Sequence, residues 1–351
     1  MNLTRKNWIL LITVSVLIVI LACCFLSITI SRLASIGATV LEQGDQPTID
    51  NVYAEGKTLL QTLFEKIELE NIVNNDGVCG NDSELLILAV GIDQRGSDYL
   101  YGLADVIRIV RIDFKNPHIN VVALPRATLI NVPPEIKVDG PMLLNQSYFF
   151  GAPGMNHFDG PNYGAGSLQK ALEYNFGIST ERYLVVDFQA FVRFVDAIGG
   201  IEVDLPTFVD DRPSSYFEAG VQTLDGAQAL TLARVRSKYS DLARIENQTI
   251  VIKAIINRLK DPAIIIKLPQ ILDALNGSFK TDFSVSQMTN LICLLPQLNS
   301  ENIQFFNPTD QVITTGWEFI PNMNQEMEIF RWDQRLTDWI KESLNAQPLQ
   351  E

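Results

Sequence analysis

The first long apolar stretch of the chain covers residues 8–30 and contains no charged side chain. At about 1.5 Å per residue, a helix of this length crosses a hydrocarbon core of about 30 Å. Arg5 and Lys6 precede it, so the positive-inside rule places the N-terminus in the cytoplasm and the following domain outside. The alternatives are a cleaved signal peptide, whose apolar core is typically about 7–15 residues, and a lipid anchor on Cys23. We expect one uncleaved helix that makes the chain a single-pass protein of the cell membrane.

From residue 84 onward, short apolar runs alternate with segments of helical periodicity. The apolar runs predict strands at 85–92, 106–114, 119–125, 182–188, 201–206 and 302–306. Helical spacing predicts helices at 164–178, 189–200, 224–233, 241–261, 264–275, 286–298 and 328–344. Strands that alternate with helices predict an α/β fold, in which helices cover both faces of a mostly parallel or mixed sheet.

The same patterns divide the chain into consecutive parts. We expect a cytoplasmic N-terminus (1–7), a transmembrane helix (8–30), a partly helical extracytoplasmic spacer (31–83), the α/β domain with accessory helices (84–307) and a C-terminal extension (308–351). The extension has no function that its residues reveal. We expect its Trp-containing helix to pack on the domain or to follow the cell wall.

Charge and cysteine content exclude several classes of function. The formal net charge is −14 over 351 residues, which argues against a nucleic-acid binder, because such proteins need a broad surface of Lys and Arg. Of four cysteines, Cys23 and Cys24 lie in the predicted span, and Cys79 and Cys293 are either joined in a disulfide or separate thiols. With two histidines and no CxxC pair, a zinc site or a His-based triad is not expected.

Two aspartates flank neighbouring predicted strands. Asp93 directly follows the run 85–92, and Asp105 directly precedes the run 106–114, so both carboxylates are expected at one edge of the sheet. Carboxylate oxygens together with water and substrate phosphates suit Mg²⁺. The alternative is that each aspartate caps a turn.

Arginines gather at other predicted element ends in this acidic chain. Arg126 follows a strand, and Arg234 and Arg236 are two residues apart, so in extended backbone they point to the same side. Arg244 and Gln248 are four apart on the next helix and share a face. Arginine pairs bidentately with phosphate oxygens, so these groups predict a focused polyanion site. A solvated helix face is the alternative.

Several blocks of sequence, in consistent order, resemble one known family. They are LILAVGIDQRG (86–96), VVALPRATL (121–129), LVVDFQAFVRFVDAIGGIEVDLP (184–206), AGVQTLDGAQALTLARVRSK (219–238) and DLARIENQ (241–248). The segment from about residue 84 to 259 thus resembles the catalytic domain of the LytR–CpsA–Psr (LCP) family of cell-wall polymer ligases. The resemblance implies an α/β/α fold with a central mixed sheet.

The resemblance also implies an activity. LCP proteins hold a polyprenyl-pyrophosphate-linked glycan with its lipid in an apolar tunnel, and here Val192, Val195 and Ile252 are expected in the tunnel wall. They transfer the phosphoglycan to a hydroxyl of a wall acceptor, usually peptidoglycan, and release polyprenyl phosphate. By this resemblance Asp93 and Asp105 bind Mg²⁺. The residues implied around the pyrophosphate are Arg95, Arg126, Arg234, Arg236, Arg244 and Gln248, with catalysis resting on Arg126, Arg234 and Arg236.

Some positions depart from the family pattern. Ala127 stands where a carboxylate usually follows the arginine, which leaves the general base unassigned. Leu103-Ala104, Leu143-Leu144-Asn145 and Asn247 stand where the family often has Arg-Ser, Lys-Ile-Asn and arginine, so positive charges are missing. Arg108, inside a predicted strand, either compensates for them or pairs with a nearby acid, and we expect the acid partner. The departures keep two alternatives open: a non-catalytic binder of polyprenyl lipid or glycan, and a polyprenyl-pyrophosphate hydrolase using the same pocket.

Overall fold

The computed structural model describes most of the α/β domain and of the C-terminal extension. The described residues are 83–93, 102–211, 215–235, 241–258, 279–284, 287, 290, 294, 298 and 301–348. The predicted span 8–30, nearly all of the spacer, the helix 264–275 and most of the helix 286–298 lie outside them, as do Cys79, Cys293, Arg95 and Arg236. No helix within the described ranges is long and apolar enough to cross a membrane.

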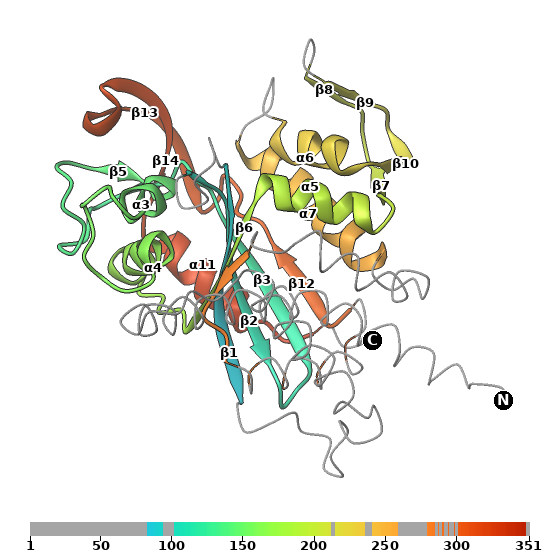
Figure 1. Cartoon of the computed structure of the whole chain (residues 1–351), viewed down its shortest axis with the longest axis horizontal. Coiled ribbons are helices and arrows are strands. Elements are labelled where there is room, and N and C mark those ends of the chain that lie inside the picture. The colour runs from blue at the N-terminus through green and yellow to red at the C-terminus, as the bar shows by residue number, and fades with distance from the viewer. Residues whose placement is uncertain are drawn as a thin grey trace, which may run out of the picture.

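A mixed β-sheet forms the centre of the domain (Figure 1). Its described strands, in spatial order, are β11 (Phe279–Thr281), β6 (Arg182–Asp187), β1 (Glu84–Ile92), β2 (Ala104–Asp113), β3 (His118–Leu124) and β12 (Ile303–Phe306). The β1–β6 and β3–β12 pairs are parallel, and the other neighbours are antiparallel. The predicted mixed sheet is therefore confirmed, and β1, β2, β3, β6 and β12 lie within one or two residues of the predicted runs.

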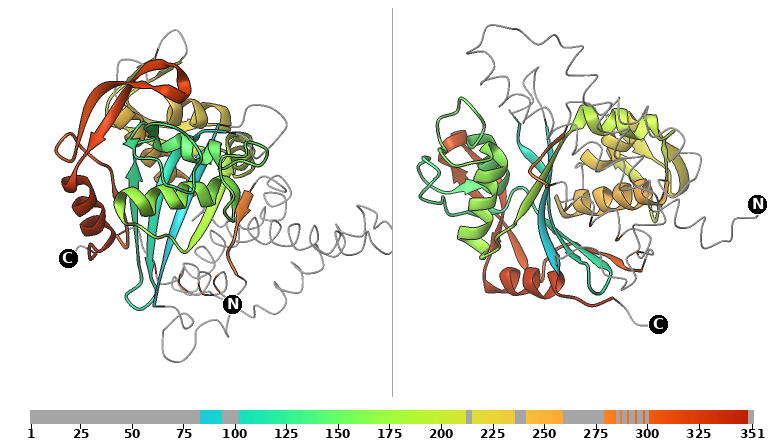
Figure 2. Two further views of the ribbon diagram at one scale, coloured as in Figure 1. Left: turned by 90° about the vertical axis from the view of Figure 1, so that its left-hand side faces the viewer. Right: turned by 60° about the horizontal axis from the view of Figure 1, so that its bottom comes forward.

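Helices cover both faces of the sheet (Figure 2). One face carries α5 (Phe188–Ala197), α6 (Gly226–Arg234) and α7 (Asp241–Arg258), and the other carries α3 (Leu144–Phe150), α4 (Tyr163–Phe176) and α11 (Gln334–Leu344). Alternate residues of β1 supply the two cores: Leu85 and Ile87 pack toward α5–α7, whereas Leu88 and Val90 pack toward α3, α4 and α11. The predicted α/β/α layering is confirmed.

Local signals in the sequence define where the helices begin and end. Asp187 ends β6 and caps α5, because its side chain accepts a hydrogen bond from the Ala190 N–H at 2.7 Å. Asp225 opens α6 in a capping box with Gln228. Gly177 closes α4 with a φ of +66°, a left-handed conformation that glycine adopts without steric cost. These caps hold α5 and α6 at the edge of the sheet where β6 ends.

Short two-stranded ribbons complete the described fold. They are β4 (Leu129–Ile130) with β5 (Met142–Leu143), β7 (Ile201–Leu205) with β10 (Gly220–Leu224), β8 (Val209–Asp211) with β9 (Ser215–Phe217), and β13 (Ile313–Ile320) with β14 (Gln325–Trp332), the last pair joined through the 3₁₀ turn η2 (Pro321–Met323).

The helix predicted at 328–344 is wrong in its first part. Residues up to Trp332 belong to β14, which pairs along its whole length with β13, and the helix α11 begins only after Asp333. The Asp333 side chain accepts a hydrogen bond from the Arg335 N–H and so caps α11. Pairing with β13 overrides the helical spacing of the apolar residues in this stretch.

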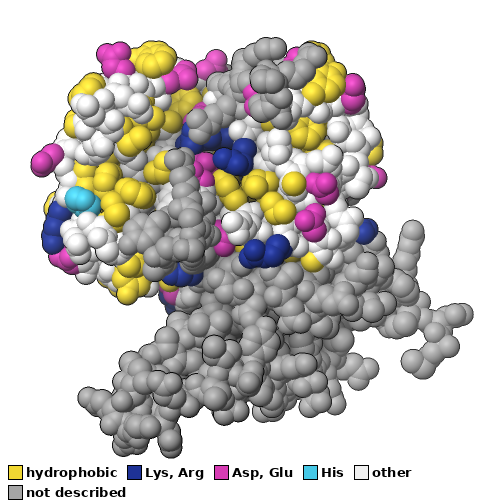
Figure 3. All heavy atoms as spheres, turned by 45° about the horizontal axis from the view of Figure 1, so that its top comes forward, with side chains coloured by type: hydrophobic (Ala, Val, Ile, Leu, Met, Phe, Trp, Pro, Cys, Tyr) yellow, Lys and Arg dark blue, Asp and Glu magenta, His cyan; other side chains and the backbone are white. Residues whose placement is uncertain are grey.

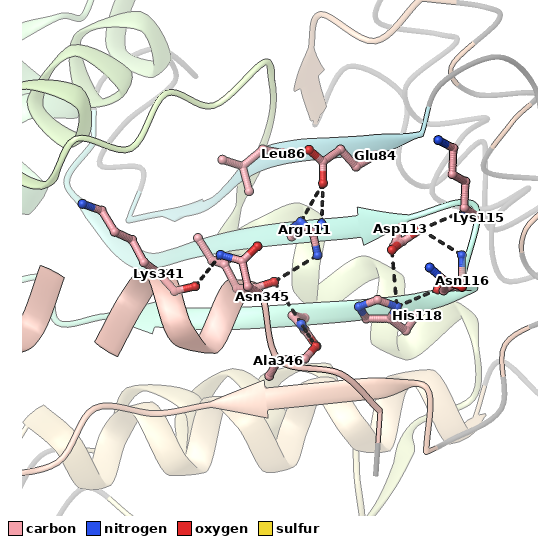
Figure 4. Close-up of polar contacts among 12 residues, drawn as sticks. Glu84, Leu86, Arg111, Asp113, Lys115, Asn116, His118, Lys341, Asn345 and Ala346 are labelled. Atoms are coloured by element: carbon pink, nitrogen blue, oxygen red, sulfur yellow. Dashed lines mark hydrogen bonds and ion pairs between the residues drawn. The ribbon is translucent and has the colours of Figure 1, made fainter. Parts of the chain in front are cut away.

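The described part of the C-terminal extension shares the core of the α/β domain. Leu336, Ile340 and Leu344 of α11 are buried in the same cluster as β1 and α4. Beyond α11 the backbone lies against the sheet, where the buried Asn120 donates hydrogen bonds from Nδ2 to the carbonyl oxygens of Leu344 (3.0 Å) and Ala346 (2.7 Å). Figure 4 shows this segment against β2 and β3, beside the Arg111–Glu84 ion pair.

Candidate functional site

Asp93 and Asp105 lie at the same edge of the central sheet. Because β1 and β2 are antiparallel, the end of β1 meets the beginning of β2, with Ile92 opposite Ala104. The Asp93 N–H donates to the Leu103 carbonyl at 3.0 Å, and Asp93 Oδ1 accepts from the Leu103 N–H at 2.7 Å. Both aspartates are buried. The prediction that Asp93 and Asp105 lie at one edge of the sheet is confirmed.

A chain of ion pairs starts at Asp105 and joins three elements of the fold. Arg126, just after β3, places Nη1 2.5 Å from Asp105 Oδ1. The Nε of Arg126 lies 3.5 Å from Oδ2 of Asp241, the first residue of α7, and the same oxygen lies 3.3 Å from Nη2 of Arg244. The predicted convergence of Arg126 and Arg244, which are far apart in sequence, is therefore found in the structure. We call Asp105, Arg126, Arg234, Asp241 and Arg244 the polar rim.

Arg234 lies on a helix, not in the extended backbone that the sequence predicted for it. The capping box at Asp225 starts α6, and good helix formers extend it so that Arg234 is its last residue. Extended backbone begins only at Val235. The Arg234 guanidinium lies over the ring of Phe188, 5.2 Å from the ring centroid, and its charge is close enough to affect Arg244. Arg236 is outside the described residues.

Arg244 and Gln248 share one buried face of α7, as their spacing predicted. Gln248 Nε2 donates to the carbonyl oxygens of Ala233 (3.3 Å) and, weakly, Asp105 (3.5 Å). Burial lowers the pKa of Arg244, and the charges of Arg126 and Arg234 lower it further, whereas Asp241 and Asp105 oppose the shift. Burial and the neighbouring arginines thus disfavour the charged form of Arg244, whereas the two aspartates favour it.

An apolar cavity of about 310 Å³ runs from the polar rim between the sheet and helices α5–α7. Ala89 and Gly91 leave room for it, because a Cβ at Gly91 would already lie 3.0 Å from Val106. Figure 3 shows Lys and Arg side chains gathered in the hollow between the two flanks of the domain. The apolar lining of the cavity comes from Ala89, Val90, Gly91, Val106, Leu184, Val186, Phe188, Phe191, Phe194, Leu230, Ala233, Val251, Ile252 and Ile255.

The cavity wall corrects one detail of the sequence prediction. Ile252 lines it as expected, but Val192 and Val195 do not. Helix α5 instead contributes Phe188, Phe191 and Phe194, which follow one another at intervals of three residues and so lie on one side of the helix. Val195 is buried in the core between α5 and its neighbours.

Comparison with known proteins matches the chain to one family. The family model described as "LytR_cpsA_psr family" matches residues 51–342. The chain belongs to this family.

Named relatives agree with the assignment to the LytR_cpsA_psr family. A "polyisoprenyl-teichoic acid--peptidoglycan teichoic acid transferase TagU" from Oceanobacillus iheyensis is 30% identical over 208 residues, and the corresponding TagV of Bacillus subtilis is 24% identical over 238 residues. These matches cover 59% and 66% of this chain, but only 61% and 58% of the relatives' own lengths.

Solved structures share the fold. The crystal structure of B. subtilis TagV superposes with a TM-score of 0.57 at 22% identity, covering 77% of this chain and all of that one. A structure described as TagT bound to LI-WTA gives a TM-score of 0.54 at 20% identity, covering 75% of this chain and 90% of that one.

Asp93 and Asp105 would hold a metal ion only together with ligands from elsewhere, such as phosphate and water. Within the described ranges no group of three or more His, Cys, Asp or Glu side chains could hold a metal ion alone. Asp93 and Asp105 supply two carboxylates at one edge of the sheet, which is the protein share that Mg²⁺ takes when phosphates and water complete its six ligands.

The prediction that Arg108 pairs with an acid is wrong for the described residues. Its guanidinium donates to neutral oxygens: the carbonyl of Ile245, Gln248 Oε1, Thr249 Oγ1 and Asn307 Oδ1. No acidic partner occurs among the residues that the structure describes, because the inner part of this face is lined by apolar and amide side chains.

Sequence reasoning missed two aspartates of the site. Asp241 joins Arg126 to Arg244, and its position three residues before Arg244 on a predicted helix was the available signal. Asp187 caps α5 and lines the cavity, and it stands at the end of a predicted strand just as Asp93 does. At the departures from the family pattern, Ala127, Leu143 and Leu144 are buried in apolar clusters, so a charge there would need a partner.

Proposed function

We propose that the chain transfers a phosphoglycan from a polyprenyl-pyrophosphate-linked carrier to a hydroxyl of a cell-wall acceptor, with peptidoglycan the favoured acceptor, and releases polyprenyl phosphate. The observation that carries this proposal is the joining of an apolar cavity to a rim of arginines and aspartates. A lipid chain fits the first part and a diphosphate the second. The TagU and TagV relatives, named as polyisoprenyl-teichoic acid–peptidoglycan teichoic acid transferases, support the same reaction.

The reaction exchanges one phosphorus–oxygen bond for another. The acceptor oxygen bonds to the phosphorus that carries the glycan, the bond from that phosphorus to the bridging oxygen breaks, and the bridging oxygen leaves on polyprenyl phosphate while the hydroxyl proton is released. Such transfers need alignment and neutralisation of spreading negative charge more than covalent help from the protein. Arg126, Arg234 and Arg244 supply fixed donors for the phosphate oxygens, and Arg95 and Arg236 are proposed to join them.

Asp93 and Asp105 are proposed to hold Mg²⁺, which when bound neutralises charge on the phosphate oxygens. Arg126 orients the Asp105 carboxylate through its 2.5 Å contact, and Gln248 binds the Asp105 carbonyl from α7. Asp105 is thus held at its side chain by Arg126, just after β3, and at its backbone by Gln248 of α7. A site held in this way needs little rearrangement when substrate arrives.

We also propose that residues 8–30 anchor the chain as a single span with its α/β domain outside the cytoplasm. A polyprenyl carrier resides in the same membrane, so the anchor keeps the cavity near its substrate. Protease treatment of intact protoplasts tests this arrangement: the domain should be cleaved while a cytoplasmic marker survives. Protection of the domain would contradict it.

The function is tested by incubating the full-length chain in detergent micelles with a polyprenyl-pyrophosphate-linked glycan, Mg²⁺ and peptidoglycan fragments. A phosphodiester between glycan and peptidoglycan, formed only with metal, is the expected product. Free phosphorylated glycan without the acceptor attached would identify a hydrolase. Saturable binding without any turnover would identify a binding protein, and absence of binding would overturn the proposal.

A further inference from the structure

Arg108 carries a buried positive charge that no acidic side chain balances within the described part of the chain. It lies in the middle of β2, is 3% exposed and lines the cavity. Its hydrogen bonds to Ile245, Gln248, Thr249 and Asn307 span 3.2–3.4 Å and all end on neutral oxygens. The Nε atom has no hydrogen-bond partner within the described part of the chain.

A charge in this position is costly unless something pairs with it. Isolated buried charges are disfavoured by several kcal/mol, and neutral dipoles compensate less than an opposite charge does. Burial lowers the pKa of Arg108 to about 9, so the guanidinium still carries its proton at neutral pH. An apolar residue would suit the surrounding strand better, so the arginine needs a functional reason.

The charges that line the cavity show what Arg108 adds. Among the described residues that line the cavity, three are cationic (Arg108, Arg234 and Arg244) and two are acidic (Asp105 and Asp187). Asp105 pairs with Arg126 and Arg244 with Asp241. Arg108 instead meets only neutral oxygens within the described part of the chain. A negative charge brought in by a ligand would find its counter-charge there.

The position of Arg108 relative to the rim fits a ligand of two charged units. Arg108 is three residues along β2 from Asp105, about 10 Å in the direction of the strand. Gln248 spans the gap, since its amide donates toward the Asp105 carbonyl and accepts from Arg108 Nη2. Arg108 is thus one amide group below the rim, between the charged entrance and the apolar interior.

We propose that Arg108 is a second, inner anion-binding position, which contacts the phosphate nearest the lipid chain and makes the cavity select amphiphiles bearing a diphosphate. The assignment rests on the function proposed above, and it names a residue and a ligand specificity within that site. The rim binds the outer phosphate, and Arg108 binds the inner one where apolar wall begins. Arg108 also supplies positive charge close to the rim, where Leu103 stands at a position that is often arginine in the family.

The test compares two probes of equal chain length, geranylgeranyl diphosphate and the uncharged geranylgeraniol, binding to the full-length chain in detergent micelles. Wild-type protein should prefer the diphosphate. In Arg108→Met, which keeps the length and apolar stem of the side chain, the preference should fall by about thirtyfold or more, as expected when one partner of a buried charged contact is removed. Arg108→Lys should restore part of it, and alcohol binding should remain at the wild-type level in all three proteins.

The ratio of the two affinities separates this proposal from simpler roles. If Arg108 only supported the packing of α7, Arg108→Met would lower thermal stability and weaken both probes together, with the ratio unchanged, and that result would overturn the proposal. If wild-type protein itself showed no preference for diphosphate, the proposed function would fail first. If wild type clearly preferred the diphosphate and Arg108→Met kept that preference, the Arg108 assignment alone would be contradicted.

Discussion

Asp105 and Arg126 face each other across the edge of the sheet, with Arg126 Nη1 2.5 Å from Asp105 Oδ1. One residue stands at the beginning of β2 and the other just beyond β3, so the antiparallel pairing of these strands brings them together. Arg126 also reaches Asp241, which in turn pairs with Arg244. The charged groups of the site are thus held by rigid strands and a helix start before any ligand binds.

Removing the carboxylate of Asp93 or Asp105 should stop transfer without unfolding the protein. Asp105→Asn and Asp93→Asn keep the side-chain volume but remove a charge that the phosphate-bound metal needs. We expect Mg²⁺-dependent turnover to fall by at least about a hundredfold, the scale seen when one well-placed electrostatic group is lost. Initial rates over a range of Mg²⁺ concentrations measure the effect. Asp338→Asn, at an exposed position of α11, is the matched control and should keep wild-type rates. Full activity of both Asp93→Asn and Asp105→Asn would contradict the metal assignment.

Substitutions of Arg234 and Arg244 should affect diphosphate binding and the free energy of unfolding to different extents. Arg234 is exposed apart from its contact with Phe188, so Arg234→Ala should weaken geranylgeranyl diphosphate binding while changing the free energy of unfolding by no more than about 1 kcal/mol. Arg244 is 3% exposed and paired with Asp241, so Arg244→Ala should lower both binding and stability, the latter by about 3 kcal/mol.

Binding isotherms and urea unfolding of the same preparations measure the two effects of the arginine variants. Unchanged diphosphate affinity in Arg234→Ala and Arg244→Ala together would contradict the rim as an anion site. A stability loss of similar size in both variants would contradict the difference in burial between the two side chains.

A larger side chain at Ala89 should close the cavity and leave the rim intact. Ala89 is on a central strand but only partly buried, because it faces the cavity. Ala89→Phe should therefore weaken geranylgeranyl diphosphate binding by tenfold or more, given about 0.8 kcal/mol for each methylene no longer buried. Inorganic pyrophosphate binding should be unaffected. Val221→Phe, at an exposed position of β10, adds the same ring outside the cavity and should change neither affinity; equal losses in both variants would contradict a lipid-binding cavity.

The central sheet and its covering helices could be predicted from the sequence because their signals are local. Apolar runs of strand length gave β1, β2, β3 and β6 to within one or two residues, and Gly177 marks a helix end because glycine readily adopts the left-handed conformation. The common edge for Asp93 and Asp105 was predicted because one residue follows an apolar run and the other precedes the next run. These features depend on neighbours within a few residues.

The parts that could not be predicted depend on partners distant in sequence. The sequence of β14 has helical spacing of its apolar residues, and only its pairing with β13 makes it a strand. The partners of Arg108 come from α7 and from Asn307, so nothing near Arg108 in sequence shows that they are neutral. The role of Asp241 similarly depends on Arg126, which lies after a different strand. Tertiary context decides each of these.

The contact of Asn120 with the C-terminal segment should make residues beyond α11 part of the stable domain. Asn120 is fully buried, and Asn120→Ala would leave the carbonyls of Leu344 and Ala346 without this donor. We expect the free energy of unfolding to fall by about 1–3 kcal/mol, the cost of unsatisfied buried polar groups. Urea unfolding followed by tryptophan fluorescence measures it. Gln304→Ala is the matched control, because Gln304 makes an exposed 3.4 Å contact with the Gln347 carbonyl, and it should change stability by less than about 0.5 kcal/mol. A loss of less than about 0.5 kcal/mol in Asn120→Ala would contradict the contribution of the C-terminal segment to the stable domain.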